Sequence, residues 1–515
     1  MEGASAAVPA STRADGPAGS APGDKGLKAN AIGFVSGVVI GVASTAPGYS
    51  LAASLGLVVA ISGVGVQAPV IMIAAFIPML LVASAYYWMN RADPDCGTTF
   101  SWVTRAMGPS AGWIGGWAII VADVIVMANL AQIAGLYSFL LFGVDAPSTL
   151  AVTAIGVLFI MAMTWICVIG IELNAKTQIG LLGAEIAALG LFAVVALVRV
   201  WAGDGLDTSI NPSLSWFNPA EIGSVSALTS GVLIAVFIYW GWDTTVTVNE
   251  ETEDSGETPG RAAIVSTLIL VLTYVIVTVA ALSFGGPERL ATDDSGDVLG
   301  LLANDVFGSD LLGKIVIIAV LTSAAASCQT TILPTARTAL SMARAKAMPA
   351  KLGEIDKRYL TPAFATWLMG IISVVWYVGL TLVSENILFD AIAALGLMIA
   401  FYYGITAFAC TIYYRREVVR NARNFVMLGV APLAGGLMLG FVFVKSCIDL
   451  ADPANSESGD SWLGLGPPFV IGIGFLLMGV VLMTIWRIQG HPEFFGRKPE
   501  VADPALVAAS PAGGD

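Results

Sequence analysis

The chain has 515 residues, of which 57% are hydrophobic and only 12% are charged, and its formal net charge is -13. Soluble proteins average about 25% charged residues, so this composition excludes a soluble domain and indicates an integral membrane protein. The five cysteines lie far apart, without the spacing of a metal or disulfide framework, and we expect no metal, no cofactor and no nucleic-acid partner.

Residues 1–28 are rich in Ala, Gly, Pro and Ser and lack the apolar core of a signal peptide, so we expect a disordered N-terminal tail that is retained. Residues 490–515 have a similar composition and are expected to form a disordered C-terminal tail. Between the tails the chain carries twelve apolar segments of spanning length. They lie at 31–61, 67–89, 110–142, 149–171, 177–201, 222–248, 260–284, 311–334, 363–384, 388–413, 426–449 and 466–488. Segments of this kind satisfy their backbone groups in a bilayer as helices, so the fold class is an all-α membrane protein.

The basic residues predict the orientation of these spans. With a cytoplasmic N-terminus, 20 of the 24 Lys and Arg residues fall on inner loops and tails, and the exceptions are Arg199, Arg289, Lys314 and Lys445. This bias places both termini in the cytoplasm, and we expect a multi-pass protein of the plasma membrane. The stretch "GSDLLGKI" has part of a phosphate-binding loop pattern but lacks Ser or Thr after its lysine, so we do not expect it to bind a nucleotide. Without a nucleotide site, any transport by this chain would be driven by a gradient.

The first span contains "GVASTAPGYSLAA" (Gly41 to Ala53), in a region where residues 29–90 carry no Asp, Glu, Lys or Arg. A proline inside a helix removes a backbone donor and clashes with the preceding turn. One interpretation is an ordinary kink. The other is a helix opened at its centre, whose second half presents free N–H groups to a substrate carboxylate. The predicted substrate-binding residues here are Ser44, Thr45, Ala46, Pro47, Gly48 and Tyr49.

The sixth span contains a second break, "YWGWD", in an otherwise uncharged run. A matching break five spans later is typical of transporters with inverted repeats, although two kinks remain the alternative interpretation. Carbonyl groups at the end of the first half-helix would suit an amino group. The predicted substrate-binding residues here are Ile238, Tyr239, Trp240 and Trp242. Together the two breaks predict a receptor for an α-amino acid near the bilayer midplane.

Three longer stretches resemble the amino acid–polyamine–organocation transporter superfamily. They are "PDCGTTFSWVTRAMGPSAGWIGGW", "FIYWGWDTTVTVNEETEDSGETPGRAAI" and "PTARTALSMARAKAMPAKLGEIDKRYLTPAF". The resemblance implies two inverted five-helix repeats, at 29–202 and 203–414, followed by two extra helices at 415–489. It also implies uptake or exchange of amino acids or related amines, coupled to protons, sodium or a counter-substrate.

Acidic residues inside the spans are candidates for coupling, because a buried carboxylate is costly in a membrane. Asp243, in the second break, is the first candidate for the proton carrier, and its alternative role is a structural helix cap. In the fifth span, some sodium-independent members of the superfamily carry a lysine, whereas this chain has Glu185. Glu185 is either a second proton carrier or a solvated acid of the inner vestibule. Asp123 in the third span is placed to receive a cationic side chain or an amine.

Hydroxyl and aromatic groups complete the candidates. Thr322, Ser323 and Ser327 offer oxygen atoms for sodium, although small residues also allow close helix packing. Tyr402 and Tyr403 are candidates for pocket walls, against ordinary packing. We therefore predict a non-enzymatic symporter that moves amino acids by alternating access, with protons preferred over sodium. The alternatives are an exchanger, a polyamine or amine carrier using Asp243 and Asp123, and, more remotely, a channel or an intramembrane enzyme.

Overall fold

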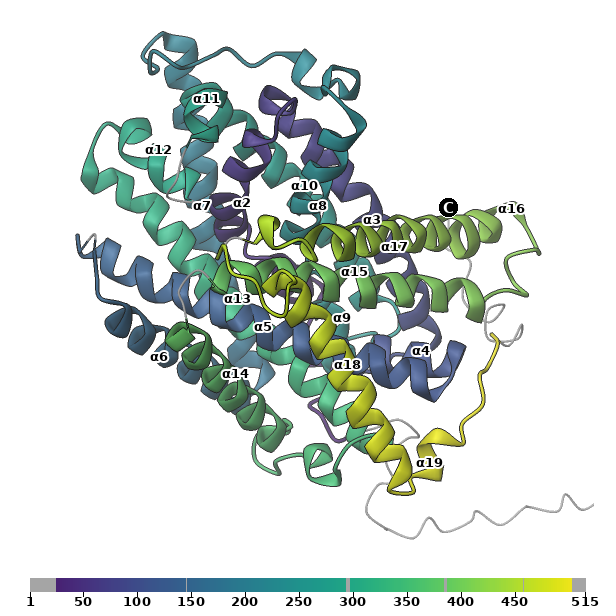
Figure 1. The fold of residues 1–515 in the computed structure, drawn as a ribbon. Coiled ribbons are helices and arrows are strands. Elements are labelled where there is room, and N and C mark those ends of the chain that lie inside the picture. Colours follow the sequence, from purple (N-terminus) through teal and green to yellow (C-terminus); the bar gives the residue numbers. More distant parts are fainter. Residues whose placement is uncertain (1–24, 145, 293–296, 384–386, 457, 503–515) are drawn as a thin grey trace, which may run out of the picture.

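The computed structural model describes residues 25–502 apart from residues 145, 293–296, 384–386 and 457, and these described residues form a bundle of helices joined by loops (Figure 1). In the first half of the chain the elements are α1 (Phe34–Ser44), α2 (Pro47–Ala60), η1 (Gly65–Gln67), α3 (Ala68–Ala92), α4 (Thr99–Met107), α5 (Pro109–Leu141), α6 (Thr149–Ile169), α7 (Ile171–Ala202), η2 (Leu214–Phe217), η3 (Pro219–Glu221), α8 (Val225–Ile238), α9 (Thr244–Thr247) and η4 (Asn249–Glu251). In the second half they are α10 (Thr258–Gly285), α11 (Pro287–Ala291), α12 (Val298–Phe307), α13 (Asp310–Arg344), η5 (Ala350–Gly353), α14 (Ala363–Val383), α15 (Ile387–Tyr413), α16 (Ala422–Asn424), η6 (Phe425–Val430), α17 (Ala431–Leu450), η7 (Pro453–Asn455), α18 (Pro467–Ile488) and α19 (Pro492–Phe495).

Among the described residues, eleven helical segments are long and apolar enough to cross a membrane, and α1 and α2 together form the first of them. The one remaining expected span, the sixth, at 222–248, is divided into α8, which has 14 residues, and α9, which has 4. The all-α fold class and the discontinuous first and sixth spans are therefore confirmed. The limits of the two inverted repeats stay a prediction.

The long helices α5 and α13 pack against each other in the middle of the bundle (Figure 1). Helix α13 also packs against α7, and α15 packs against α5 and α17. Much of α18 exposes apolar side chains such as Leu477 and Val481, as expected for a helix that faces lipid. The candidate site described below is built on α1, α2, α5, α7, α8, α13 and α15. The C-terminal helices α17, α18 and α19 contribute no residue to it.

The two predicted tails are shorter than expected. Residues 1–24 and 503–515 lie outside the described residues, but residues 25–28 and 490–502 are described and partly packed. Lys25 is only 9% exposed, and Phe494 of α19 is fully buried with its ring 5.6 Å from that of Phe100. The composition of these stretches predicts disorder, but a few of their residues are buried or form ion pairs. Those contacts offset the conformational entropy that is lost when the segments become ordered.

Candidate functional site

The first span is interrupted where the proline predicted it. Helix α1 ends at Ser44, Ala46 adopts a left-handed conformation with φ 47°, and Pro47 is the first residue of α2. Proline is favoured at a first helical position because the N–H group that it lacks would have no partner there. The N–H groups of Thr45 and Ala46 donate to the carbonyls of Val42 and Ala43, which tightens the last turn of α1. The span is therefore two helices with a real break between them.

The sixth span is interrupted at Gly241, and its break touches the first one. Gly241 has φ +117°, a region that favours glycine, and a Cβ atom there would lie 2.7 Å from the carbonyl oxygen of Ser44. The hydroxyls of Ser44 and Thr244 lie 2.8 Å apart, and Ser327 of α13 donates to the Ser44 carbonyl at 2.9 Å. The two breaks thus form one contiguous region against α13.

The N–H groups at the start of α2 are bound to groups of the protein itself. Gly48 N–H donates to Glu185 Oε1 at 2.7 Å, and Tyr49 N–H donates to the Ser323 hydroxyl at 3.2 Å. Ser50 N–H donates to the Ala46 carbonyl at 2.8 Å. With the N–H groups of Thr45 and Ala46 also used, this conformation leaves no N–H group between residues 45 and 50 for a substrate carboxylate. The expected orientation of these groups toward the substrate is therefore not what the structure shows.

Glu185 of α7 occupies the position that a substrate carboxylate was expected to take. Its side chain is fully buried, and its second oxygen, Oε2, has no hydrogen-bond partner among the described residues. No basic side chain of the described chain forms an ion pair with it. One oxygen lies at the positive end of the α2 dipole and the other is unpaired, so this carboxyl group can gain a proton with little rearrangement.

Asp243 is held by two tyrosines. Its Oδ1 accepts a hydrogen bond from the Tyr403 hydroxyl at 2.7 Å, and its Oδ2 accepts one from the Tyr402 hydroxyl at 3.3 Å. Although Asp243 precedes α9, its side chain makes no capping hydrogen bond to that helix. The alternative interpretation of Asp243 as a structural cap is therefore not supported by the geometry.

Asp123 of α5 is the third buried acid, and it is 3% exposed. Its Oδ2 accepts a hydrogen bond from Thr335 of α13 at 2.9 Å. Its charge is close enough to that of Asp243, at the second break, for the two carboxylates to repel each other. Within the described part of the chain, neither carboxylate has a Lys or Arg partner. The pair therefore forms a region of uncompensated negative charge, or holds protons, at this level of the bundle.

The predicted aromatic residues divide into two groups. Trp240 donates its indole N–H to the Tyr402 hydroxyl, and Trp242 is fully buried with its ring stacked on Tyr403 at 5.1 Å. These residues surround Asp243. Tyr239 instead donates its hydroxyl to the Met72 carbonyl of α3, away from this cluster. Trp240, Trp242 and the two tyrosines are thus brought together, and Tyr239 contributes packing against another helix.

The carbonyl groups at the end of α8 differ in what they contact. The Ile238 carbonyl accepts a hydrogen bond from the Tyr274 hydroxyl. No donor among the described residues reaches the carbonyl oxygens of Tyr239 and Trp240. These two oxygens and the nearby Asp243 carboxylate are acceptors, which suits an ammonium group better than an anion.

Several contacts were not predicted from the sequence. Tyr49 donates its hydroxyl to Asn129 of α5, and Thr335 holds Asp123. Asn129 is a polar residue in an apolar span, and that signal could have identified it. Of the hydroxyls considered for sodium, Ser323 and Ser327 reach the first break. Thr322 instead donates to the Ile318 carbonyl of its own helix at 2.7 Å.

A cavity of about 390 Å³ lies away from the two breaks, between α5, α14 and α18. It is lined by apolar residues that include Trp113, Trp117, Met369 and Phe475. The indole N–H of Trp113 donates to the Ala347 carbonyl and that of Trp117 to the Phe475 carbonyl, so neither is free for a ligand. The cavity therefore lacks the polar groups that an amino acid requires.

Comparison with known proteins gives one family. The family model described as amino acid permease matches residues 29–479. A branched-chain amino acid permease of Lactococcus lactis subsp. cremoris is 26% identical over 311 residues, which cover 57% of this chain and 64% of the permease. Asc-type amino acid transporter 1 of Mus musculus is 24% identical, over 54% of this chain and 51% of the transporter. A low-affinity putrescine importer of Escherichia coli (strain K12) is 23% identical, over 76% of this chain and 82% of the importer.

Proposed function

The chain belongs to the amino acid permease family, and on this premise we propose that it is a secondary transporter that carries amino acids into the cell by alternating access, coupled to protons. The proposal includes a location in the plasma membrane with both termini in the cytoplasm. It also includes two inverted repeats at 29–202 and 203–414, and it assigns the protein no enzymatic activity. The names of two relatives, a branched-chain amino acid permease and an Asc-type amino acid transporter, support the substrate class.

The observation that carries the proposal is the direct contact between the two helix breaks at Ser44 and Gly241. Half-helix ends that meet inside a membrane protein give a small polar region with oriented dipoles, the arrangement that binds small charged substrates in such transporters. In alternating access, α1 can move relative to α2, and α8 relative to α9, because each break removes continuous backbone hydrogen bonding between the two halves of its span.

The three buried acids support proton coupling. Asp243, Glu185 and Asp123 lie in the spans without a basic partner among the described residues, and a carboxyl group in this setting exchanges charge for a proton more readily than it keeps an unpaired charge. Glu185 also contacts α2, and Asp243 lies in the second break, so each is positioned to link protonation to the conformation of a broken helix. We propose Glu185 and Asp243 as the proton carriers.

A second candidate function is the transport of amines. The N–H groups of residues 45–50 are used internally, whereas Asp123, Asp243 and the Tyr239 and Trp240 carbonyls offer acceptors only. This chemistry favours an ammonium group over a carboxylate. The similarity to a putrescine importer supports the same candidate.

Reconstitution into liposomes tests both candidates. Labelled neutral amino acids, cationic amino acids and diamines would be offered with an inward proton gradient, with a sodium gradient and with neither. The proposal expects saturable counterflow and accumulation of an amino acid under the proton gradient alone. Accumulation of diamines in preference to amino acids would select the second candidate. The absence of counterflow with every substrate would contradict transport by alternating access.

A further inference from the structure

Lys25, close to the start of the described chain, is buried between two acids from distant parts of the sequence. Its Nζ lies 2.8 Å from Asp95 Oδ2, and it also forms a hydrogen-bonded ion pair with Glu250. Asp95 lies in the loop between α3 and α4, and Glu250 lies in η4, directly after the broken sixth span. Lys25 is 9% exposed, which is unusual for a lysine, so its ammonium group needs both carboxylates to offset the loss of water.

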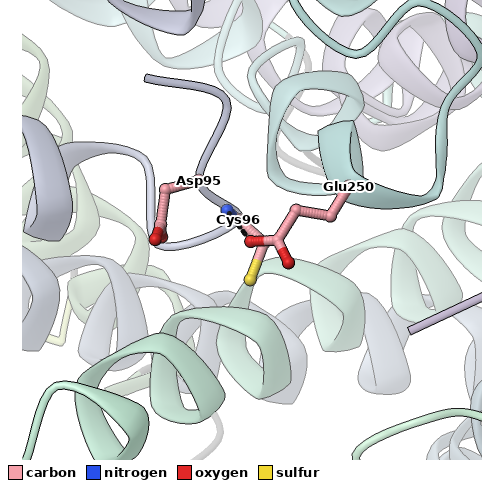
Figure 2. Close-up of side chains that lie close together, drawn as sticks. All are labelled: Asp95, Cys96 and Glu250. Carbon is pink, nitrogen blue, oxygen red and sulfur yellow. Dashed lines mark hydrogen bonds between the residues drawn. The ribbon is translucent and has the colours of Figure 1, made fainter. Parts of the chain in front are cut away.

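The two acids belong to a built site. Asp95 Oδ1 accepts hydrogen bonds from the Gly97 N–H and from the hydroxyls of Ser101 and Ser341, each at 2.7 Å. Figure 2 shows Asp95 and Glu250 on either side of Cys96, whose N–H donates to Glu250 Oε1 at 2.9 Å. Because Ser341 lies on α13, the site joins that helix to the α3–α4 loop and to the end of the sixth span.

Charge at the site favours the ammonium form of Lys25. Burial alone would lower the pKa of this group, but the carboxylates of Asp95 and Glu250 outweigh burial and raise the pKa above its usual value. Burial would raise the pKa of Asp95, and Lys25 with the hydrogen bonds from Ser341 and Ser101 outweighs it, so the pKa of Asp95 is lowered. The site therefore holds a charged lysine against at least one charged carboxylate.

The residues that follow Lys25 are fixed to the same face of the bundle. We name residues 25–32 the N-terminal strap. Arg344 at the end of α13 donates to the Lys25 carbonyl at 3.0 Å. The N–H groups of Ala31 and Ile32 donate to the Glu251 carbonyl at 2.8 and 3.0 Å, and Glu253 N–H donates to the Ile32 carbonyl at 2.9 Å. Helix α1 begins at Phe34, directly after the strap, and ends at the first break.

We propose that Asp95 and Glu250 form a cation-binding site whose tethered ligand is the Lys25 ammonium group, and that occupation of this site holds α1 and η4 against α13 and closes this face of the transporter. The closing of one face of a transporter rests on the proposed transport function. The attachment of α1 and η4 to α13 does not. While Lys25 is bound, α1 cannot move away from α13 without separating an ion pair that is largely shielded from water. Release of Lys25 weakens this attachment and favours pivoting of α1 at the break, beyond which α2 lies. The Arg337–Glu251 ion pair, which also joins η4 to α13, must separate in the same movement.

The test measures hydrogen–deuterium exchange of the full-length protein in liposomes without substrate. Lys25→Gln removes the charge and keeps most of the side chain. Loss of one partner from a buried hydrogen-bonded ion pair changes equilibria by at least about tenfold, so exchange in α1 and at residues 249–252 is expected to rise by about that factor while α2 stays unchanged. Lys25→Arg should stay close to the parent protein. Lys28→Gln is the matched control, because Lys28 pairs with Glu172 on the surface, where both side chains are about half exposed.

A second variant and a metal probe distinguish loss of the ion pair from misfolding of Lys25→Gln. Glu250→Gln removes the charge from the other side and keeps an oxygen for the Cys96 N–H, so it should reproduce the effect of Lys25→Gln. The ligand atoms of Asp95, Cys96 and Glu250 lie within 4.8 Å of one another, and zinc binds sulfur and carboxylate ligands. Zinc should therefore restore slow exchange in Lys25→Gln, leave the parent unchanged, and lose its effect when Cys96→Ser is added.

Two results would overturn the proposal. One is faster exchange confined to residues 25–32, with α1 unchanged, which would make the strap a local attachment. The other is zinc that binds to Lys25→Gln, as measured by calorimetry, without slowing its exchange, which would show that a cation at this site does not close the face. Both measurements are independent of transport activity, so a failure here is distinguishable from a failure of the proposed transport function.

Discussion

The backbone N–H of Gly48 donates a 2.7 Å hydrogen bond to the carboxylate of Glu185, 137 residues away. The bond places a buried acid of α7 at the N-terminus of α2, where the helix dipole favours negative charge. In this conformation Glu185 accepts from the N–H group that the sequence pattern assigned to a substrate carboxylate. Substrate carboxylate and Glu185 would therefore compete for the same N–H group, and protonation of Glu185 would favour the substrate.

Glu185→Gln is expected to separate binding from coupling. The glutamine side-chain oxygen can still accept the Gly48 N–H, so the fold and counterflow should persist, but the amide cannot carry a proton. Accumulation driven by a proton gradient should be lost, as measured by uptake into liposomes. Glu185→Ala is the companion variant: it leaves the Gly48 N–H unpaired and should cost about 1–3 kcal/mol of stability. Undiminished proton-driven accumulation in Glu185→Gln would contradict the assignment.

Asp243→Asn tests the second proposed carrier. The asparagine can keep a hydrogen bond from Tyr403, so exchange of substrate should continue while proton-driven accumulation falls and the pH dependence of uptake flattens. Tyr403→Phe is the control, because it removes the hydrogen bond but keeps the titratable carboxyl group. That control should retain proton-driven accumulation, although with altered pH dependence. If Asp243→Asn concentrates substrate as well as the parent protein does, Asp243 is not a carrier.

Gly48 should tolerate a methyl group but not a larger side chain. A Cβ atom at this position would lie 3.4 Å from Glu185 Oε1 and 3.5 Å from the Ala319 carbonyl and Ser323 Cβ, which is ordinary contact. Gly48→Ala should therefore keep most of the transport rate. Gly48→Leu must displace Glu185 or Ser323, and overpacking of this kind costs about 1–3 kcal/mol, so its transport should be lost at normal expression. Equal initial rates of uptake for the two variants would exclude this explanation.

Arg337 and Glu251 form a buried ion pair, and breaking it should destabilise the protein. Both side chains are at most 1% exposed, and two hydrogen bonds of 2.7 and 3.0 Å join them. Arg337→Ala leaves a buried charge unpaired and should cost about 3–5 kcal/mol, seen as a lower unfolding temperature in detergent. The double variant Arg337→Met with Glu251→Met removes both charges and should unfold at a higher temperature than Arg337→Ala. The opposite order would show that the pair is not the source of the effect.

The sequence by itself determined the membrane class, the helical fold and the positions of the two breaks. These features are local: long apolar runs require helices in a bilayer, Pro47 cannot continue the preceding helix, and Gly241 adopts a backbone conformation that favours glycine. The same pattern singled out Asp243 as a charge within a broken span. Its partners Tyr402 and Tyr403 were also candidates, but only as separate aromatic residues.

The tertiary structure decided which groups face one another. Sequence patterns assigned the N–H groups of α2 to a substrate, but the packing of α7 against the bundle gives one of them to Glu185. Composition assigned Lys25 to a disordered tail, but the fold brings it to Asp95 and Glu250. Contacts between residues 70 to 225 positions apart depend on how helices pack, and packing is set by shape and burial over the whole bundle. A helix break is a property of a few neighbouring residues, and the partner of a charge is a property of the fold.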